Sequence, residues 1–237
     1  MNLPGLDHLV VVAPTLDDGV RWCEQHLGVP PGPGGTHPLM GTHNRLLSIA
    51  SSAFPGAYLE VIALDPLATP TRAPGLRRWF DMDDPRLMMQ VDTEGPLLAH
   101  WVARTPDVQQ AVHHARGVNI DPGEVLQASR ETPDGLLQWK ITVRDDGQRL
   151  FDGTFPTLIE WGDRHPAARM PDSGVRLERL TLRHPQPDTL RAGLRVTGLL
   201  ENPALHIETG PPGLEARFQV AGATRQLSSA LPLMSSR

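Results

Sequence analysis

Cysteine is almost missing from this sequence. Cys23 is the single cysteine among 237 residues. One thiol forms no internal disulfide, which excludes the small secreted domains that depend on a disulfide framework. Cys23 lies within a helical pattern, so we expect a buried structural thiol there and not a nucleophile.

Long apolar runs and clustered positive charge are also missing. No stretch approaches the roughly 18 apolar residues of a membrane span. The formal net charge is −5, and without a basic patch neither nucleic acid nor an anionic membrane is an expected partner. The N-terminal residues have no signal-peptide pattern, which predicts a cytoplasmic protein. The expected partner is a small-molecule substrate, and homodimerisation is left open.

Several familiar catalytic motifs are absent too. The sequence contains no GxSxG nucleophile elbow, no Walker phosphate loop, no CxxC pair and no HExxH helix. Proline (24 residues) and glycine (22 residues) are abundant, which predicts many turns and loops. The chemistry therefore has to come from residues that are far apart in the sequence.

A strand–helix pattern occurs three times. The three copies are LDHLVVVAPTLDDGVRWCEQHLGV (6–29), LAHWVARTPDVQQAVHHARGV (98–118) and LERLTLRHPQPDTLRAGLRVTGL (177–199). Each starts as an alternating apolar strand, breaks at Pro or Asp, and continues as an amphipathic helix. The helices end at glycines, as helix C-termini often do: Gly28, Gly117 and Gly198.

Further strand patterns complete these units and predict an α+β fold. Residues 1–66 and 97–168 each contain a strand, a helix and three more strands, which is a βαβββ module. Residues 67–96 form the connection, with a short helix expected at 76–80. Residues 175–237 predict a shorter βαββ-like module at the C-terminal end.

Strand parity predicts a candidate metal site. Alternate residues of a strand face opposite sides, and His8 would face away from the helix-covered side. His100 holds the equivalent position in the second copy, whereas the third copy has Arg179 there. Glu60 and Glu160 occupy the last strands of the two modules, and we assign both to the same face as the histidines.

Two imidazoles and two carboxylates suit Zn, Fe, Mn, Co or Ni without distinguishing among these divalent ions. Open positions on the ion would accept two neighbouring oxygens of a substrate, and the ion would act as a Lewis acid. The alternative is that these side chains are hydrogen-bonded structural residues, with His100 beside Trp101 as a core histidine.

Substrate contacts are expected from two other segments. The segment HPLMGTHNR contributes His37, His43, Asn44 and Arg45, which we place in a loop at the mouth of the cavity. Arg130 is a candidate for an anionic substrate group, since a guanidinium binds carboxylate bidentately. The alternatives are a structural turn for the first segment and a solvated arginine at a strand end.

Five segments together resemble a known family: DHLVV, HPLMGTHNRLL, YLEVIALDP, ASRETPDGLLQWK and FPTLIEWGDRHP. They are similar to the glyoxalase-like domain branch of the vicinal-oxygen-chelate (glyoxalase/bleomycin resistance/dioxygenase) superfamily, over residues 6–166. The resemblance implies a cupped mixed sheet of paired βαβββ modules. It also implies metal ligands on the first and last strands, carried over as His8, Glu60, His100 and Glu160.

The family includes lyases, isomerases, dioxygenases and metal-free binding proteins, so the fold does not decide the reaction. Our leading hypothesis is a metal-dependent lyase or isomerase acting on a small oxygenated metabolite through two vicinal oxygens. Glu60 or Glu160 would serve as general base. The alternative is a metal-free small-molecule binding or sequestration protein, against which the low aromatic content of 5% counts modestly.

Overall fold

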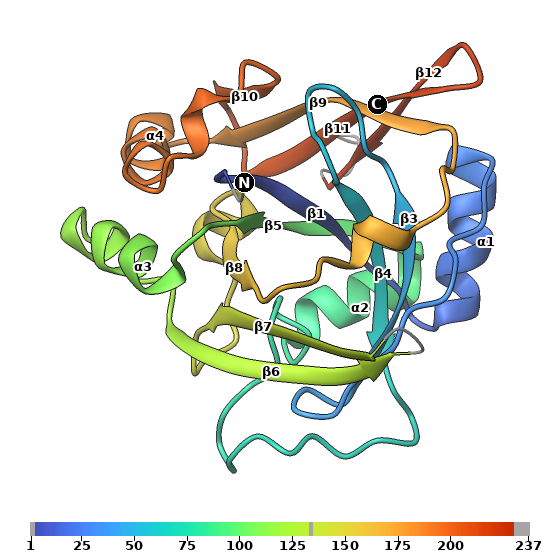
Figure 1. The fold of residues 1–237 in the computed structure, drawn as a ribbon, viewed down its shortest axis with the longest axis horizontal. Coiled ribbons are helices and arrows are strands. Elements are labelled where there is room, and N and C mark those ends of the chain that lie inside the picture. The colour runs from blue at the N-terminus through green and yellow to red at the C-terminus, as the bar shows by residue number, and fades with distance from the viewer. Residues whose placement is uncertain (1–2, 133–134, 230–237) are drawn as a thin grey trace, which may run out of the picture.

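A computed structural model describes residues 3–132 and 135–229 of the chain. The elements below are given in chain order (Figure 1). The first unit comprises β1 (Gly5–Val12), α1 (Leu16–Leu27), β2 (Thr36–His37), β3 (Thr42–Ser48) and β4 (Tyr58–Leu64). After α2 (Pro85–Glu94), the second unit comprises β5 (Leu97–Arg104), α3 (Val108–Gly117), β6 (Glu124–Thr132), β7 (Gly135–Val143) and β8 (Thr157–Trp161). The third comprises β9 (Val175–His184), α4 (Pro187–Val196), β10 (Leu205–Thr209), β11 (Gly213–Val220) and β12 (Ala223–Ser228).

The first helix shows how local sequence sets the elements. The Thr15 side chain accepts a hydrogen bond from the backbone N–H of Asp18 and so caps the start of α1. Gly28 ends the helix in the left-handed conformation (φ 72°). Gly19 lies against Val61 of β4, and a Cβ added at Gly19 would stand 2.1 Å from a Val61 methyl carbon. The glycine therefore allows α1 to approach the sheet closely.

The first two units form one eight-stranded mixed sheet with the order β2-β3-β4-β1-β5-β8-β7-β6. Within each unit the first and last strands are parallel neighbours, β1 with β4 and β5 with β8. Strands β1 and β5 join the units as an antiparallel pair at the centre. The sheet curves into a cup, with β3 and β4 on the right and β6 and β7 along the bottom in Figure 1. This confirms the predicted α+β fold of paired βαβββ modules.

The sheet separates two apolar cores. Leu9 and Val11 of β1, and Ala13 directly after it, belong to the larger core, which also contains buried residues of α1, α3 and the third unit. Val10 and Val12 belong to the second core, which lies on the concave face with α2. The alternation predicted for β1 is therefore present, and the cup side of β1 is available for a site.

The third unit packs as a separate four-stranded sheet in the order β10-β9-β11-β12. It contains the strand β12 in addition to the two strands that we expected after its helix. Its pairing also differs from the first two units, because β9 has the first strand after the helix, β10, as its parallel neighbour. The unit thus repeats the strand–helix order without repeating the sheet topology. The predicted module extends to residue 237, and residues 230–237 lie outside the described part.

The connecting segment differs from the prediction of a helix at 76–80. Residues 76–78 have no regular structure, Trp79 lies in a bend and Phe80 in a turn, and the helix of this segment is α2, at Pro85–Glu94. Asp84 caps α2 by accepting from the Arg86 backbone N–H, and Pro85 occupies the first turn. These start signals outweigh the apolar residues near position 80, where Phe80 has a φ of +58°. Among the described residues, no helix is long and apolar enough to cross a membrane.

Candidate active site

A small cavity of about 30 Å³ lies on the concave face of the sheet. Its lining includes five aromatic side chains, of Tyr58, Trp79, Phe80, Trp139 and Trp161. The whole chain has only five Phe, five Trp and one Tyr. The aromatic content is therefore low but concentrated at one place, which weakens the composition argument against a binding cavity. The polar lining consists of His8, His37, Asn44, Glu60 and Arg130.

A buried row of charged groups forms the polar wall of this cavity. His8 on β1 contacts Asp7 through Nδ1, at 2.7 Å from Asp7 Oδ1. On its other side, His8 Nε2 lies 3.5 Å from Glu60 Oε2. Asp7, His8 and Glu60 are exposed by 0%, 4% and 5% of their surface. The imidazole thus stands between two buried carboxylates, and its Nε2 faces Glu60.

A β-bulge brings Asp7 into this row. Leu6 pairs with Ala103 and His8 pairs with Val102, so Asp7 is the extra residue of β1 at this point. A bulge re-aims a side chain relative to simple alternation. Strict parity places Asp7 on the helix-covered side, which explains why it is missing from our predicted site. The one feature of the sequence that indicates a role for Asp7 is its position directly before His8 in DHLVV.

Two residues from the end of the second unit hold Asp7. Trp161 Nε1 donates to Asp7 Oδ2 at 3.0 Å. His165 Nε2 lies 2.9 Å from the same oxygen. The Nδ1 atom of His165 accepts from the Ala167 backbone N–H, so Nε2 carries the proton that bonds Asp7. His165 is missing from the predicted site because no sequence pattern connects it to a residue 158 positions earlier.

Asn44 connects the carboxylate row to the rest of the polar lining. Its Nδ2 donates to Glu60 Oε1 at 2.6 Å and lies 3.3 Å from His37 Nε2. Its Oδ1 accepts from the Gly35 backbone N–H and lies 3.5 Å from an Arg130 nitrogen. One amide side chain therefore holds Glu60 and His37 relative to each other, and Arg130 lies at the oxygen end of the same amide.

Burial and mutual charge set the protonation of the row. Burial alone would lower the pKa of His8, but its hydrogen bonds and charge interactions with Asp7 and Glu60 raise it to about 9. Burial alone would raise the pKa of Glu60, but interactions with His8, the charge of His37 and the Asn44 hydrogen bond lower it to about 2. At neutral pH His8 is an imidazolium and Glu60 a carboxylate.

His37 is different, because burial dominates and lowers its pKa to about 4. Its Nδ1 lies 3.1 Å from Thr42 Oγ1, and its Nε2 faces the Asn44 amide. A neutral imidazole that donates from Nδ1 and accepts at Nε2 satisfies both contacts. The cavity thus holds one charged and one neutral histidine.

Two residues that line this cavity each have a buried N–H group without a hydrogen-bond partner among the described residues. Among the described residues, the buried side-chain nitrogens and oxygens that lack a hydrogen bond are Trp79 Nε1 and Arg130 Nε. Both residues line the cavity. An unsatisfied buried donor costs about 1–3 kcal/mol. Both groups lack an acceptor, so the arrangement suits a ligand that brings oxygen atoms.

The second half of the predicted metal set lies elsewhere. His100 is buried, but Thr157 N donates to its Nε2 and its Nδ1 lies 3.1 Å from the Gly153 carbonyl oxygen. Both ring nitrogens are thus engaged. Burial and then the charge of Arg149 lower the pKa of His100 to about 3. It behaves as the hydrogen-bonded core histidine of our alternative interpretation.

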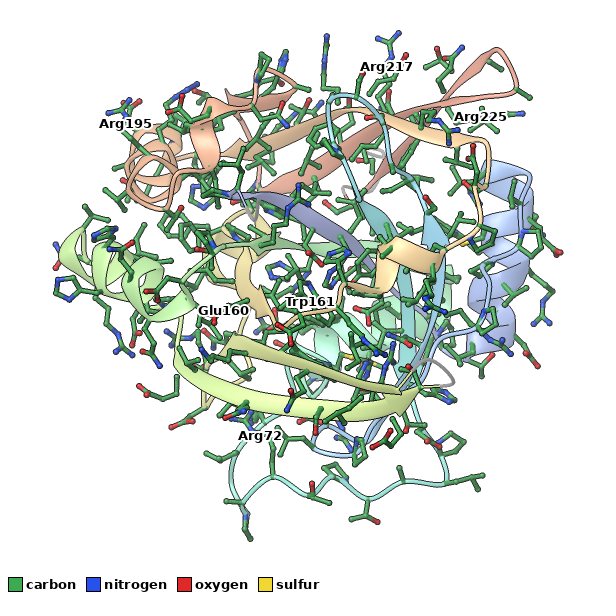
Figure 2. The ribbon with its side chains drawn as sticks, viewed as in Figure 1. Arg72, Glu160, Trp161, Arg195, Arg217 and Arg225 are labelled. Atoms are coloured by element: carbon green, nitrogen blue, oxygen red, sulfur yellow. The ribbon has the colours of Figure 1, made fainter. Side chains whose placement is uncertain are left out.

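Glu160 faces away from the cup, contrary to the parity that we assigned to it. Its Oε2 accepts from the backbone N–H of Val108 at the start of α3, and Oε1 pairs with Lys140 at 2.7 Å. Its neighbours Ile159 and Trp161 line the cavity instead. Figure 2 shows Glu160 beside α3 and Trp161 toward the centre of the molecule. The predicted alternation of side chains along this strand is present, but Glu160 lies on the face opposite to the one predicted.

The predicted substrate contacts divide between the two faces of the sheet. His37, Asn44 and Arg130 line the cavity. His43 and Arg45 alternate with Asn44 along β3, so they point to the other side, and Arg45 is exposed. The expected loop at this segment is a regular strand from Thr42 onward, and its alternation removes these two residues from the cavity.

These positions decide whether the residues fit the predicted divalent metal. Among the described residues, no group of three or more His, Cys, Asp or Glu side chains is arranged to hold a metal ion. His100 has both nitrogens engaged, Glu160 lies on the far face, and one Glu60 oxygen accepts from Asn44. His8 and Glu60 remain together, but the four predicted ligands do not converge. The arrangement therefore does not fit the four-ligand site.

A sequence model described as glyoxalase-like domain matches residues 6–197. A solved structure, a hypothetical protein from Staphylococcus aureus, is similar with a TM-score of 0.58 and 13% identity, over 95% of this chain and 99% of that chain. Methylmalonyl-CoA epimerase from Mycobacterium tuberculosis has a TM-score of 0.38 and 17% identity, over 66% and 86%. A mutant 4-hydroxymandelate synthase from Streptomyces coelicolor has a TM-score of 0.47 and 12% identity, over 96% and 63%. No curated protein sequence matches the chain significantly.

Proposed function

This chain belongs to the glyoxalase-like domain family, and from that premise we propose that it is an isomerase- or lyase-type enzyme of proton transfer. Its substrate is a small oxygenated metabolite that binds in the cavity beside His8 and Glu60. The observation that carries the proposal is the buried opposition of His8 Nε2 and Glu60 Oε2 at 3.5 Å. An acid and a base at this spacing reach neighbouring atoms of one substrate.

The two groups have complementary roles in such a reaction. Glu60 Oε2 accepts a proton from a carbon next to a carbonyl group. The electron pair of that C–H bond forms a carbon–carbon double bond, and the carbonyl π pair moves to the oxygen. The His8 imidazolium donates its Nε2 proton to that oxygen, while Asp7 holds the ring through Nδ1. Return of a proton to carbon gives an isomerisation, and loss of a neighbouring leaving group gives an elimination.

The surroundings support these roles. Asn44 occupies Glu60 Oε1 and leaves Oε2 for the substrate. Displacing the imidazolium from Glu60 by a bound substrate would weaken the interaction that keeps the carboxylate pKa low, so binding makes Glu60 a stronger base. The aromatic lining makes the surroundings of the pair less polar, which strengthens the electrostatic interactions in the site. No metal-dependent step is part of the proposal, because the predicted ligands do not fit.

A second candidate is favoured by the concentration of aromatic side chains in the lining. A metal-free binding or sequestration protein would use the same cavity without chemistry. The two candidates differ in whether Glu60 exchanges protons with a bound ligand.

The test is carbon-bound hydrogen exchange in D₂O, followed by proton NMR on a panel of small 2-oxo and 2-hydroxy acids. Wild-type protein is compared with Glu60→Gln and with Glu160→Gln, a matched change outside the cavity. We expect wild type and Glu160→Gln to exchange a C–H proton of at least one acid at equal rates. Glu60→Gln should lose at least about 100-fold, the usual contribution of a general base.

Elemental analysis of the same preparations gives the metal content. Binding of the acids without exchange in wild type would replace the proposal by the sequestration candidate. Equal loss in the two variants would show that Glu60 has no special role. About one metal ion per chain, lost in Glu60→Gln and not in Glu160→Gln, would overturn the metal-independent mechanism.

A further inference from the structure

A much larger cleft adjoins the small cavity. The outer cleft has a volume of about 760 Å³ and lies between the strands β3, β6 and β7 and the segment 163–173. Four side chains line both spaces: Leu46, Arg130, Leu137 and Pro166. The two spaces therefore meet along a shared wall, and a ligand that enters the cavity from this side passes the cleft.

The sizes of the two spaces differ too much for one compact ligand. A space of about 30 Å³ accommodates little more than a water-sized group. The outer cleft is of the size that holds a drug-sized molecule. A substrate that reaches the His8–Glu60 pair thus places only a small reacting part inside and the rest of the molecule outside.

Arg130 stands where the two spaces meet. It lines both, its buried Nε has no hydrogen-bond partner, and its contact with Asn44 Oδ1 is long at 3.5 Å. No ion pair joins its guanidinium to a carboxylate within residues 3–132 and 135–229. A partly buried guanidinium without a counter-ion binds an oxyanion favourably, with two parallel N–H bonds for a carboxylate.

Asn44 lies between this anion site and the acid–base pair. The same amide contacts Arg130 through Oδ1 and Glu60 through Nδ2. The anion site and the acid–base pair thus lie at the two ends of one amide group. A carboxylic acid that binds at both therefore has its reacting carbon close to its carboxylate.

The lining of the outer cleft indicates what extends outward. Apolar side chains from three segments contribute to it, including Val29, Pro33, Leu47, Ala168 and Met170. Charged groups also contribute, at the segment that contains Arg164 and Arg169. An apolar chain that lies along the apolar part of the lining would remove that part from water.

Resting on the proposed function, we infer that the substrate is an oxygenated carboxylic acid with an elongated apolar chain. Its carboxylate binds Arg130 at the junction, its reacting carbon lies between His8 and Glu60, and its chain occupies the outer cleft. Arg130 is then the residue that selects acids, and the cleft selects chain length.

The test is equilibrium binding by calorimetry, with 2-oxobutanoate, 2-oxohexanoate, 2-oxooctanoate and 2-oxodecanoate as probes and the matching methyl esters as controls. In wild type we expect the dissociation constant to fall about fourfold per added methylene group. Arg130→Gln should weaken every acid at least about tenfold, the loss of a charge-assisted bond, and keep the same dependence on chain length. The esters should bind wild type and Arg130→Gln equally.

Substitutions that fill the outer cleft test the binding of the apolar chain separately from the binding of the carboxylate. Ala168→Trp, on an exposed position of the cleft wall, should remove the dependence on chain length while 2-oxobutanoate binds as before. Val29→Trp, from the opposite segment, gives the same result if Ala168→Trp fails to fold. An affinity independent of chain length in wild type overturns the tail assignment, and equal binding of acids by Arg130→Gln overturns the carboxylate assignment.

The experiment separates this inference from the proposed function. Binding needs no turnover, and Glu60→Gln keeps Arg130 and the outer cleft. Chain-length-dependent binding without proton exchange in wild type would refute the enzyme proposal and keep the ligand class. Proton exchange on short acids with no gain from longer chains would refute the inference and keep the enzyme.

Discussion

The charge on His8 predicts that the fold loses stability as the pH rises above neutral. Its pKa is raised from 6.5 to about 9 in the folded protein by Asp7 and Glu60. In the unfolded chain it returns to the ordinary value of about 6.5. Below this value both states carry the proton and the stabilisation is complete. Between the two pKa values only the folded state holds the proton, so the free energy of unfolding falls with rising pH and the contribution is gone above about pH 9.

The size of the effect follows from the shift. Each pKa unit corresponds to about 1.4 kcal/mol, and the shift from 6.5 to about 9 therefore corresponds to about 3 kcal/mol. A typical domain has an unfolding free energy of about 5–15 kcal/mol. Loss of one proton from one buried side chain would thus remove a large part of the stability.

The assay is urea unfolding of chelator-treated protein, followed by tryptophan fluorescence from about pH 6 to about pH 10, the window of this titration. His8→Gln is the control, because glutamine has the polar groups of a side chain of similar reach and no proton to lose. Wild type should lose about 3 kcal/mol more than the variant across the window. A parallel decline of the two proteins, or a constant wild-type stability, would refute the assignment of a charged His8 between Asp7 and Glu60.

Two further predictions concern the helices. Gly19→Ala should destabilise the protein by about 1–3 kcal/mol, because the new methyl group would overlap Val61. Urea unfolding measures this loss. The control is Gly117→Ala, at a helical position with open space around it, which should show no loss in the same assay. Asp84→Ala should cost about 1 kcal/mol by removing the cap of α2. The thermal midpoint of Asp84→Ala should fall relative to that of Asp92→Ala, an exposed change in the same helix, and equal midpoints would contradict the capping role.

The fold was largely predictable because strand alternation and helix caps are local signals. Thr15 and Gly28 bound α1 where the sequence places its ends, and the two βαβββ units follow from the same kind of pattern. The apolar residues near position 80 favour a helix there, whereas the Asp-Pro start signal places α2 at Pro85–Glu94. The additional strand β12 is largely exposed, so it lacks the apolar alternation that marks a strand.

The candidate site was predictable only in part. His8 and Glu60 lie on neighbouring parallel strands, and alternation placed both toward the cup. Asp7 was missed because a bulge breaks that alternation. Glu160 was misplaced because a five-residue strand with apolar residues on both sides does not reveal which face is inside. His165 joins the site through its contact with Asp7, and no local sequence pattern predicts a contact over this distance along the chain.

The joining of Asp7 to His165 has a consequence for how the protein acquires its activity. This hydrogen bond joins residues 158 positions apart. In addition, β1 must pair with β5, about 90 positions later, before the part of the sheet around Asp7 is formed. Contacts between such distant segments form slowly, because the chain loses the entropy of loop closure before the stabilising contacts form. A chain still emerging from the ribosome has His8 and Glu60 early but lacks the partners that hold them in place. Ordering of the Asp7–His165 contact would therefore report completion of folding more faithfully than helix content does, because the helices form from local signals.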